Sequence, residues 1–182
     1  MIVALVGMPS SGKGEASKIF EELGFSVVRM RSAVLEKLGE MGLEVNIENV
    51  GKAALRMREE RGPAAVAEKT LPAVKAAGEN VCIEGVRSRE EVEFFREAFG
   101  DFACVGIDAP AEKRYEWALG RDREDDARSP EEFGAKEKRE GDWGIGKAVG
   151  HADYIVQNDG SLEEFRRKVR ELVEKILKGR EI

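Results

Sequence analysis

The sequence predicts an α/β protein built around a mainly parallel sheet with helices on both faces. Two observations lead to this prediction. Short runs rich in valine alternate with stretches of helical periodicity along the 182 residues, which is the pattern of repeated strand, helix and parallel strand. The first run also passes directly into a glycine-rich loop and a helix, an arrangement that suits the binding of anions. At this length the chain fits one domain, 1–182, with a full core.

Five stretches have the length and the β-branched content of buried strands. They are Ile2–Val6, Ser26–Arg29, Asn80–Glu84, Phe102–Asp108 and Asp153–Gln157. Each is followed by a helical pattern, so the connections have room to cross over the sheet and keep the strands parallel.

Capping residues mark where several helices begin and end. The first helix is expected to run from the glycine-rich loop to about Leu23, and Gly24 is placed to end it. Ser88 and Glu91 have the spacing of a capping box, so they predict a helix start after the third strand. Ser161 opens a second box, which begins the closing helix of the chain.

Two helical segments do not fit simple alternation, and we expect both to recognise substrate. The segment 32–77 follows the second strand and contains three helical stretches, which are separated near Gly42 and at Gly62-Pro63. The segment 121–150 is dense in charge and holds a capping box at Ser129. It is interpreted as a lid that closes over a bound nucleotide, and the alternative is a solvated loop.

The loop after the first strand has the form G-x-x-x-x-G-K, whose backbone N–H groups cradle phosphates. It predicts a nucleotide site made of Gly7, Met8, Pro9, Ser10, Ser11, Gly12, Lys13 and Gly14. The alternative is a glycine turn that serves packing alone. Lys13 argues against it, since an ammonium group at the centre of the loop serves a triphosphate. Gly14 stands where Ser or Thr usually holds Mg²⁺.

The third strand ends in an acidic residue and is followed by a basic one. Ligands of open α/β sheets collect at the carboxyl ends of the strands, so Glu84 is predicted to order Mg²⁺ through water. Arg87 is predicted to hold a phosphate as a catalytic residue, with Gly85 allowing close approach of the backbone. The alternative is a strand end with a surface arginine.

Further candidates lie at the start of the lid segment and after the last strand. Arg121 is predicted to be catalytic and Arg123 to bind nucleotide, because guanidinium groups that arrive with a lid stabilise phosphate charge. The alternative is a solvated helix end, where the helix dipole favours arginine side chains in any case. Asn158 and Gly160 belong to a tight turn at the same edge of the sheet and are predicted to border the purine.

Composition limits the partners. The net charge of −6 offers no extended basic surface for a nucleic acid. The apolar amino-terminal stretch is too short to cross a bilayer, so no membrane partner is expected. Cys82 and Cys104 lie in separate apolar runs and are predicted to be small, buried hydrophobic residues. Free cysteines of this kind indicate a reducing compartment, so the protein is expected to be cytoplasmic. The composition does not predict the oligomeric state.

These motifs resemble the adenylate-kinase-type P-loop kinases, and more closely an archaeal branch described as similar to dephospho-coenzyme A kinase. The resemblance covers nearly the whole chain and rests on residues 7–14, 84–88, 121–126, 143–146 and 152–161. It implies a three-layer P-loop kinase fold with strand order 2-3-1-4-5, an acceptor-binding insertion at 32–77 and a lid at 121–150. In that order the first strand separates the strands of Cys82 and Cys104, which is too far for a disulfide.

Three positions depart from the pattern of those kinases. They usually have an Asp soon after the second strand and an Arg three residues later, where this chain has Ser32 and Leu35, so neither role transfers. Arg29 or Arg31 is a possible substitute. Glu15 stands where adenylate kinases usually have Thr and is counted among the nucleotide-binding residues. By contrast, Gly14 fits the resemblance, because adenylate kinases also carry Gly there and hold Mg²⁺ mainly through water.

The leading hypothesis is an ATP-dependent, Mg²⁺-requiring phosphotransferase whose partner is a small-molecule phosphate acceptor, such as a nucleoside monophosphate or dephospho-coenzyme A. A second hypothesis is a regulatory NTPase that binds and slowly hydrolyses nucleotide without a dedicated acceptor. A third is an RNA-end kinase, against which the acidic net charge counts.

Overall fold

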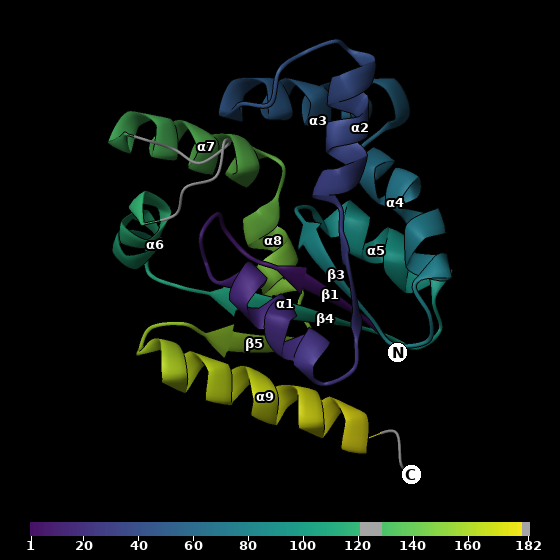
Figure 1. Ribbon diagram of the computed structural model, residues 1–182, viewed down its shortest axis with the longest axis vertical. Helices are drawn as coiled ribbons and strands as arrows, with labels where there is room; N and C mark the ends of the chain where they lie inside the picture. The colour runs from purple at the N-terminus through teal and green to yellow at the C-terminus, as the bar shows by residue number, and fades with distance from the viewer. Residues whose placement is uncertain (121–128, 180–182) are drawn as a thin grey trace.

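Five parallel strands form one sheet in the order β2-β3-β1-β4-β5 (Figure 1). The structure is a computed structural model that describes residues 1–120 and 129–179. The strands are β1 (Ile2–Val6), β2 (Ser26–Arg29), β3 (Val81–Val86), β4 (Phe102–Asp108) and β5 (Tyr154–Gln157). Neighbouring strands are parallel at each pairing. The predicted fold class and strand order are confirmed.

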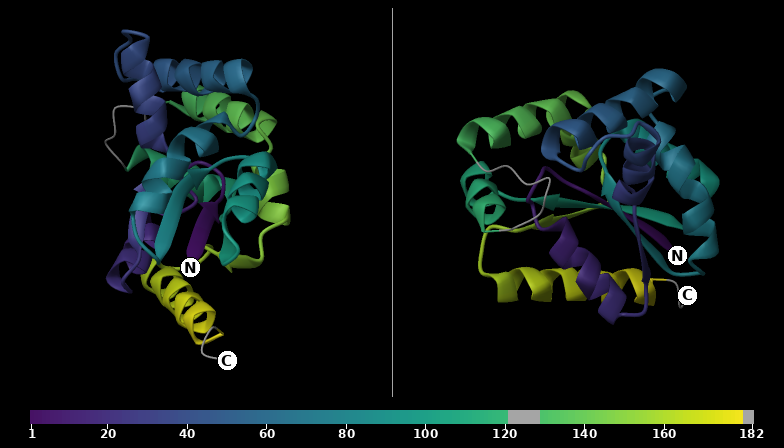
Figure 2. Two further views of the ribbon diagram at one scale, coloured as in Figure 1. Left: turned by 90° about the vertical axis from the view of Figure 1, so that its right-hand side faces the viewer. Right: turned by 45° about the horizontal axis from the view of Figure 1, so that its top comes forward.

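Helices cover both faces of this sheet. Those in the described residues are α1 (Lys13–Glu22), α2 (Arg31–Glu40), α3 (Ile47–Arg61), α4 (Ala65–Ala76), α5 (Arg89–Ala98), α6 (Ala111–Leu119), α7 (Pro130–Asp142), α8 (Ile145–Gly150) and α9 (Leu162–Lys178). Helices α1 and α9 pack together on one face, and α4, α5 and α8 lie on the other (Figures 1 and 2). The segment after β2 forms α2, α3 and α4, with breaks at Gly42 and Gly62 as predicted.

Strand β1 explains why the core has two halves. Its side chains alternate between the faces, and all five residues are buried. Ile2, Ala4 and Val6 belong to the half under α4, α5 and α8, whereas Val3 and Leu5 pack with α1 and α9. Burial of a valine or leucine side chain contributes roughly 1.5–3 kcal/mol. The central strand therefore fixes where the loop that follows it can lie.

The two cysteines are buried on opposite faces of the sheet. Cys82 packs with α1 and α9, and Cys104 packs in the other half of the core. Burial raises the pKa of the Cys104 thiol to about 12 and raises that of Cys82 well above its ordinary value. Both are free thiols, and they behave as the small buried hydrophobes that the sequence predicts.

Strand β3 extends beyond its predicted end. It runs to Val86 and contains a bulge, where Leu5 of β1 pairs with Glu84 and Val6 pairs with Val86. Gly85 between them has φ +103°, a left-handed conformation that glycine adopts without steric cost. Glu84 and Arg87 are thereby brought to the same edge as the loop after β1.

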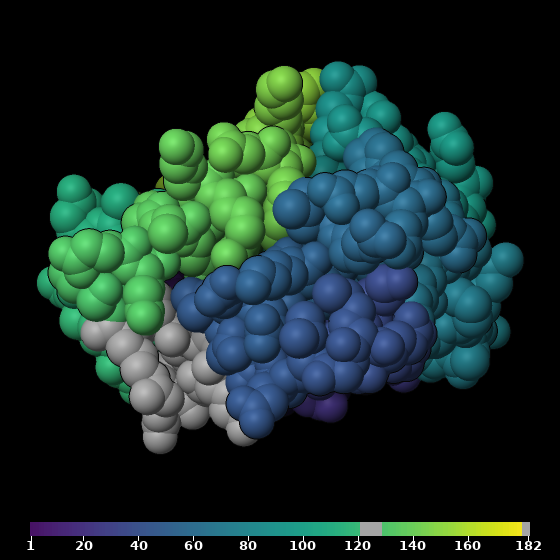
Figure 3. All heavy atoms as spheres, turned by 90° about the horizontal axis from the view of Figure 1, so that it is seen from above, coloured from purple at the N-terminus to yellow at the C-terminus, as the bar shows by residue number. Residues whose placement is uncertain are grey.

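Helices α2 and α3 face helix α7 across one end of the molecule. Figure 3 shows the two groups side by side when the molecule is seen from above. The space between them is lined by residues of α2, α3, α7 and the end of β3. Among the described residues, no helix is long and apolar enough to span a membrane.

Candidate functional site

The glycine-rich loop after β1 has the backbone geometry of an anion cradle. Gly12 is left-handed at φ +108° and precedes α1, and no described side chain caps this helix end. The N–H groups of the first helical turn therefore remain directed toward the loop, at the positive end of the helix dipole. Lys13 Nζ donates to the carbonyl oxygens of Gly7 at 2.6 Å and of Met8 at 2.8 Å. The lysine is held over the loop, at the place where it would meet phosphate oxygens.

The glycines of this loop are required by close neighbours. A Cβ atom on Gly7 would lie 2.4 Å from the carbonyl oxygen of Ile107 on β4. One on Gly12 would lie 2.6 Å from Nδ2 of Asn158 and 3.2 Å from the ring of Phe165. The distances of 2.4 Å and 2.6 Å are far below van der Waals contact, so a larger residue at either position would push the loop away from its neighbours.

Two residues brace the loop from behind. Asn158 is buried, and its Nδ2 donates to the carbonyl oxygen of Ser11 at 2.9 Å. Arg114 of α6 is buried as well and donates weakly to the carbonyl oxygen of Pro9 at 3.4 Å. The Ser11 hydroxyl is buried, and within the described residues it has no hydrogen-bond partner. A buried polar atom of this kind fits a loop that receives a phosphate oxygen.

Glu84 lies beside the start of α1 and is held from two sides. Ser17 Oγ donates to its carboxylate at 3.1 Å, and Arg29 Nε forms an ion pair with it at 3.2 Å. Carboxylate and hydroxyl oxygens are the donors that Mg²⁺ accepts. Within the described residues, no group of three or more His, Cys, Asp or Glu gathers to hold a metal directly. This donor set fits a Mg²⁺ ion that keeps most of its waters, as Gly14 in place of Ser or Thr also requires.

Glu15 is paired with α9. Its carboxylate accepts from Arg166 Nε at 2.7 Å and from Lys18 Nζ at 3.1 Å. Burial alone would raise the pKa of Glu15, but the hydrogen bonds and charges of Arg166 and Lys18 lower it below its ordinary value. The negative charge that Glu15 places next to the phosphate loop is therefore balanced from α9.

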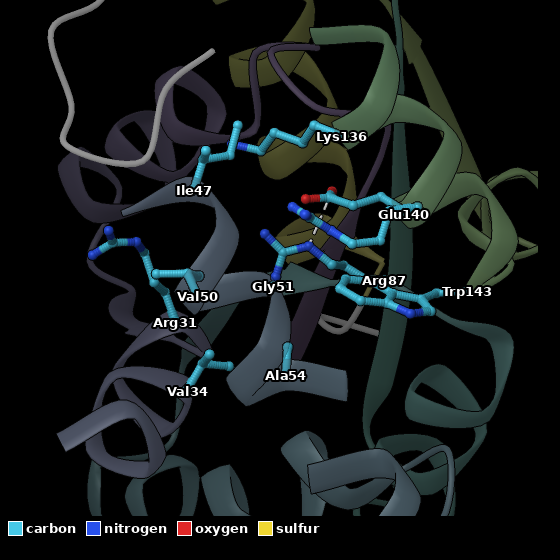
Figure 4. Close-up of a pocket in the computed structure, with 11 residues that line it drawn as sticks. Arg31, Val34, Ile47, Val50, Gly51, Ala54, Arg87, Lys136, Glu140 and Trp143 are labelled. Atoms are coloured by element: carbon cyan, nitrogen blue, oxygen red, sulfur yellow. Dashed lines mark ion pairs between the residues drawn. The ribbon is translucent and has the colours of Figure 1, made fainter. Parts of the chain in front are cut away.

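A pocket rich in cations lies between α2 and α3 on one side and α7 on the other. It is narrow, with about 20 Å³ accessible to the centre of a water molecule, and it is partly open to solvent. Four of its lining residues are basic: Arg31, Arg87, Lys136 and Arg139. Arg87 Nε forms an ion pair with Glu140 Oε2 at 3.0 Å. Figure 4 shows the Glu140 carboxylate between Lys136 and Arg87, pointing into the pocket.

Glu140 connects the pocket to the phosphate loop electrostatically. It is 3 % exposed, and burial by itself would raise its pKa. The charges of Arg87, Lys136 and Lys13 outweigh this effect and lower the pKa below its ordinary value. Glu140 is therefore an ionised carboxylate that experiences both the loop lysine and the pocket arginine.

A buried ion pair fixes one wall of the pocket. Arg58 of α3 reaches Glu91 of α5 with an Nη2 to Oε1 distance of 2.7 Å, and its guanidinium lies 4.3 Å from the ring centre of Trp143. Burial lowers the pKa of Arg58 and raises that of Glu91, although each is partly offset by the charge of the other. The second Glu91 oxygen accepts the backbone N–H of Arg87 at 2.7 Å.

The predicted capping box at Ser88 is thus only half right. Ser88 Oγ accepts from the Glu91 N–H at 3.2 Å, but the Glu91 carboxylate binds Arg58 and the N–H of Arg87 in place of that of Ser88. The box at Ser161 is complete. In addition to its place in the first turn of α5, Glu91 therefore fixes the backbone of Arg87, which lines the pocket.

Arg139 packs against the backbone of α3. A Cβ atom on Gly51 would lie 2.6 Å from Arg139 Nη1, so the absence of a side chain there allows the guanidinium to approach. Its Nε is buried and lacks a hydrogen-bond partner among the described residues. A buried donor that the protein leaves unsatisfied is suited to an anionic ligand.

Comparison with known proteins places the chain in a family. Residues 6–133 match the AAA domain family. A UPF0200 protein of Methanoculleus marisnigri is 42 % identical over 173 residues, which make up 94 % of this chain and 94 % of the relative. The chain belongs to the UPF0200 family. The resemblance to an archaeal branch of P-loop kinases is confirmed by this match and by the structural neighbours.

Solved kinase structures share the fold of the UPF0200 chain. Shikimate kinase from Aquifex aeolicus superimposes with a TM-score of 0.55 and 22 % identity over 98 % of this chain and 99 % of that one. Dephospho-CoA kinase from Campylobacter jejuni gives a TM-score of 0.58 and 17 % identity, with 98 % of both chains covered. At these identities the likeness establishes the P-loop kinase fold.

The structure brings some of the predicted site residues of the UPF0200 chain together. Residues 7–15 and Glu84 lie around the start of α1, and Arg87 faces the pocket. Asn158 braces the loop, whereas Gly160 is exposed and leaves room for the capping carboxylate of Glu164. The predicted Arg121 and Arg123 lie outside the described residues.

Other site residues were missed or left open by the sequence reasoning. Ser17 and Glu140 carry no motif of their own, and only their distances reveal them. Of the two possible substitutes, Arg31 lines the pocket and Arg29 pairs with Glu84.

Proposed function

We propose that this protein is an ATP-dependent, Mg²⁺-requiring phosphotransferase that acts on a small, anionic acceptor. The observation that carries the proposal is the register of β1 and β3, in which Val6 pairs with Val86, so that the phosphate loop and Arg87 of the cationic pocket follow neighbouring strand ends. A site for the phosphoryl donor and a cationic site for an anionic acceptor thus adjoin each other, as transfer between two bound substrates requires.

On the donor side, the loop would cradle the ATP phosphates with its backbone N–H groups and the Ser11 hydroxyl. Lys13 would leave the carbonyl oxygens of Gly7 and Met8 for the outer phosphates, where it stabilises the charge of the transferring group. ATP supplies the phosphoryl group and Mg²⁺ neutralises its charge when they are bound. Glu84, oriented by Ser17, would hold the waters of the metal.

On the acceptor side, the segment 32–77 would supply one wall of the site through α2 and α3. Arg31 and Arg139 would bind an anionic group of the acceptor, because guanidinium groups match phosphate and carboxylate oxygens. Arg87 would position the acceptor or the γ-phosphate. The segment 121–150 would act as the lid, and Arg121 and Arg123 are proposed to reach the phosphates when it closes.

One observation favours a second candidate, a regulatory NTPase without a dedicated acceptor. The kinases that the chain resembles orient the acceptor with an Asp and an Arg after the second strand. Ser32 is exposed here and Leu35 packs against the core, so neither can do this. In that case the cationic pocket would bind an effector in place of a substrate.

A coupled assay of ADP release separates the two candidates. The protein is supplied with ATP and Mg²⁺, alone and with a panel of acceptors that includes dephospho-coenzyme A, shikimate, gluconate and nucleoside monophosphates. The kinase proposal predicts that one class of acceptor raises turnover far above slow hydrolysis. If every acceptor leaves the rate at that of hydrolysis, the regulatory NTPase is the better account.

A further inference from the structure

The acceptor pocket contains a carboxylate at a position that the motifs do not predict. Among the described residues that line it, Glu140 alone is acidic, and it stands among Arg31, Arg87, Lys136 and Arg139. A pocket built only to attract an anion gains nothing from a buried negative charge. Burying a carboxylate is costly unless it is paired, so its presence calls for a chemical reason.

The geometry around Glu140 suits a group that receives a proton. Its carboxylate is oriented by Arg87 Nε at 3.0 Å and points into the pocket beside Lys136 (Figure 4). It is 3 % exposed, which keeps bulk water from competing. Its partner Arg87 follows Val86, which pairs with Val6 at the end of β1, so the ion pair lies beside the start of the phosphate loop.

The two classes of acceptor differ in what they need at this point. A phosphate acceptor attacks through an oxygen that is already ionised, and a facing carboxylate would repel it. An alcohol must lose a proton as its oxygen bonds to phosphorus, so it needs a base within hydrogen-bond reach. A carboxylate at this place therefore selects between the classes.

We propose that Glu140 is the base of the transfer and that the acceptor is an alcohol that carries a separate anionic group. This inference rests on the proposed kinase function. The acceptor oxygen forms a bond to the γ-phosphorus, the bond from that phosphorus to the β–γ bridging oxygen breaks, and ADP leaves with the electron pair. The hydroxyl proton passes to a Glu140 carboxylate oxygen and is lost to solvent when the products leave. Arg87 positions the carboxylate.

The test compares Glu140→Gln with Asp142→Asn, which removes one exposed negative charge from the same helix. Glutamine keeps the size of the side chain and an oxygen for Arg87, but it cannot take the proton. We expect the ADP-release rate of Glu140→Gln to fall about 100-fold or more, the typical effect of losing a general base. ATP affinity, measured by calorimetry, and the melting temperature should match those of the control. Glu140→Asp, which keeps a carboxylate, should recover part of the rate.

If no acceptor in the panel is used, the slow hydrolysis of ATP by the same variants still tests the role of Glu140, because the attacking water must also lose a proton. The pH profile adds a second readout, since the charged groups that act on Glu140 are the cations Arg87, Lys136 and Lys13, and the other charged residues that line the pocket, Arg31 and Arg139, are also cations. The wild-type rate should fall at acid pH as Glu140 is protonated, and the rate of Glu140→Gln should not show this fall.

The outcomes are distinguishable from failure of the kinase proposal itself. A wild-type protein that does not bind ATP would refute both. If ATP binds and Glu140→Gln turns over at the rate of Asp142→Asn, the role of Glu140 is wrong and the kinase proposal stands. Stimulation by AMP or CMP, with none by the alcohols, would overturn the acceptor class in the same way.

Discussion

Replacing Arg58 by methionine should destabilise the protein strongly, because it leaves a buried carboxylate without its cation. Arg58 and Glu91 are 10 % and 0 % exposed at their side chains. Breaking a buried pair from one side costs about 3–5 kcal/mol. The guanidinium over Trp143 contributes up to about 1 kcal/mol more, whereas the methionine side chain refills most of the space.

The expected loss is therefore about 4 kcal/mol in the free energy of unfolding, which corresponds to a fall of roughly 8–16 °C in melting temperature for a chain of this size. Calorimetry and urea titration measure both quantities. Arg56→Met on the same helix is the control: Arg56 forms an exposed pair with Glu60 at 2.6 Å, and its loss should cost less than about 1 kcal/mol.

The pH dependence gives a second check, with its sign fixed by Glu91. Burial raises the pKa of this carboxyl, and removing Arg58 takes away the charge that opposes the rise. Between its unfolded and its folded pKa, the folded state then binds more protons than the unfolded state, so stability falls as pH rises. The deficit of Arg58→Met should shrink toward pH 5. An equal loss in both variants, independent of pH, would refute the reasoning.

Three further predictions concern the donor and acceptor sites. Lys13→Met should abolish turnover while the melting temperature stays close to that of the wild type; turnover near the wild-type rate would remove the lysine from the site. Gly51→Ala should displace the Arg139 guanidinium and raise the KM for the acceptor with little change in kcat. The melting temperature should change little, because alanine favours the helix by about 1 kcal/mol and offsets the local crowding. An unchanged KM would contradict this prediction. Arg166→Ala should expose the phosphates to the charge of Glu15 and weaken ATP binding several-fold at low salt in calorimetry, an effect that high salt should reduce; equal affinities at low salt would count against it.

Much of the fold could be predicted because local signals agreed with the final arrangement. The alternation of Val3 and Leu5 with their neighbours in β1, and the glycine-rich loop that follows, specify a buried central strand and a phosphate cradle. The strand order came from the resemblance to known kinases, since periodicity alone does not say which strands are neighbours. The end of β3 was misplaced because the bulge at Gly85 extends the strand past Glu84.

The acceptor side could not be predicted because its residues come from distant segments. Glu140 and Arg87 are far apart in the sequence, and α7 must come to lie beside the residue that follows β3 before their ion pair exists. Glu91 looked like a helix cap, yet its carboxylate pairs with Arg58 from α3. The turn at Asn158 predicts a purine contact, and the hydrogen bond from its side chain to the carbonyl oxygen of Ser11 is a further contact that the local sequence does not reveal. Local patterns identify the residue types, and packing decides their partners.

The most direct test of the central claim is to follow the γ-phosphoryl group of labelled ATP and ask where it goes. Chromatography of the products, with acceptor alcohols that carry an anionic group present in turn, separates labelled acceptor from labelled inorganic phosphate. The kinase account predicts that the label appears on an acceptor and that Lys13→Met eliminates it. If the wild-type protein binds ATP and releases all of the label as inorganic phosphate, whichever acceptor is present, the protein is not a kinase for this class of acceptor.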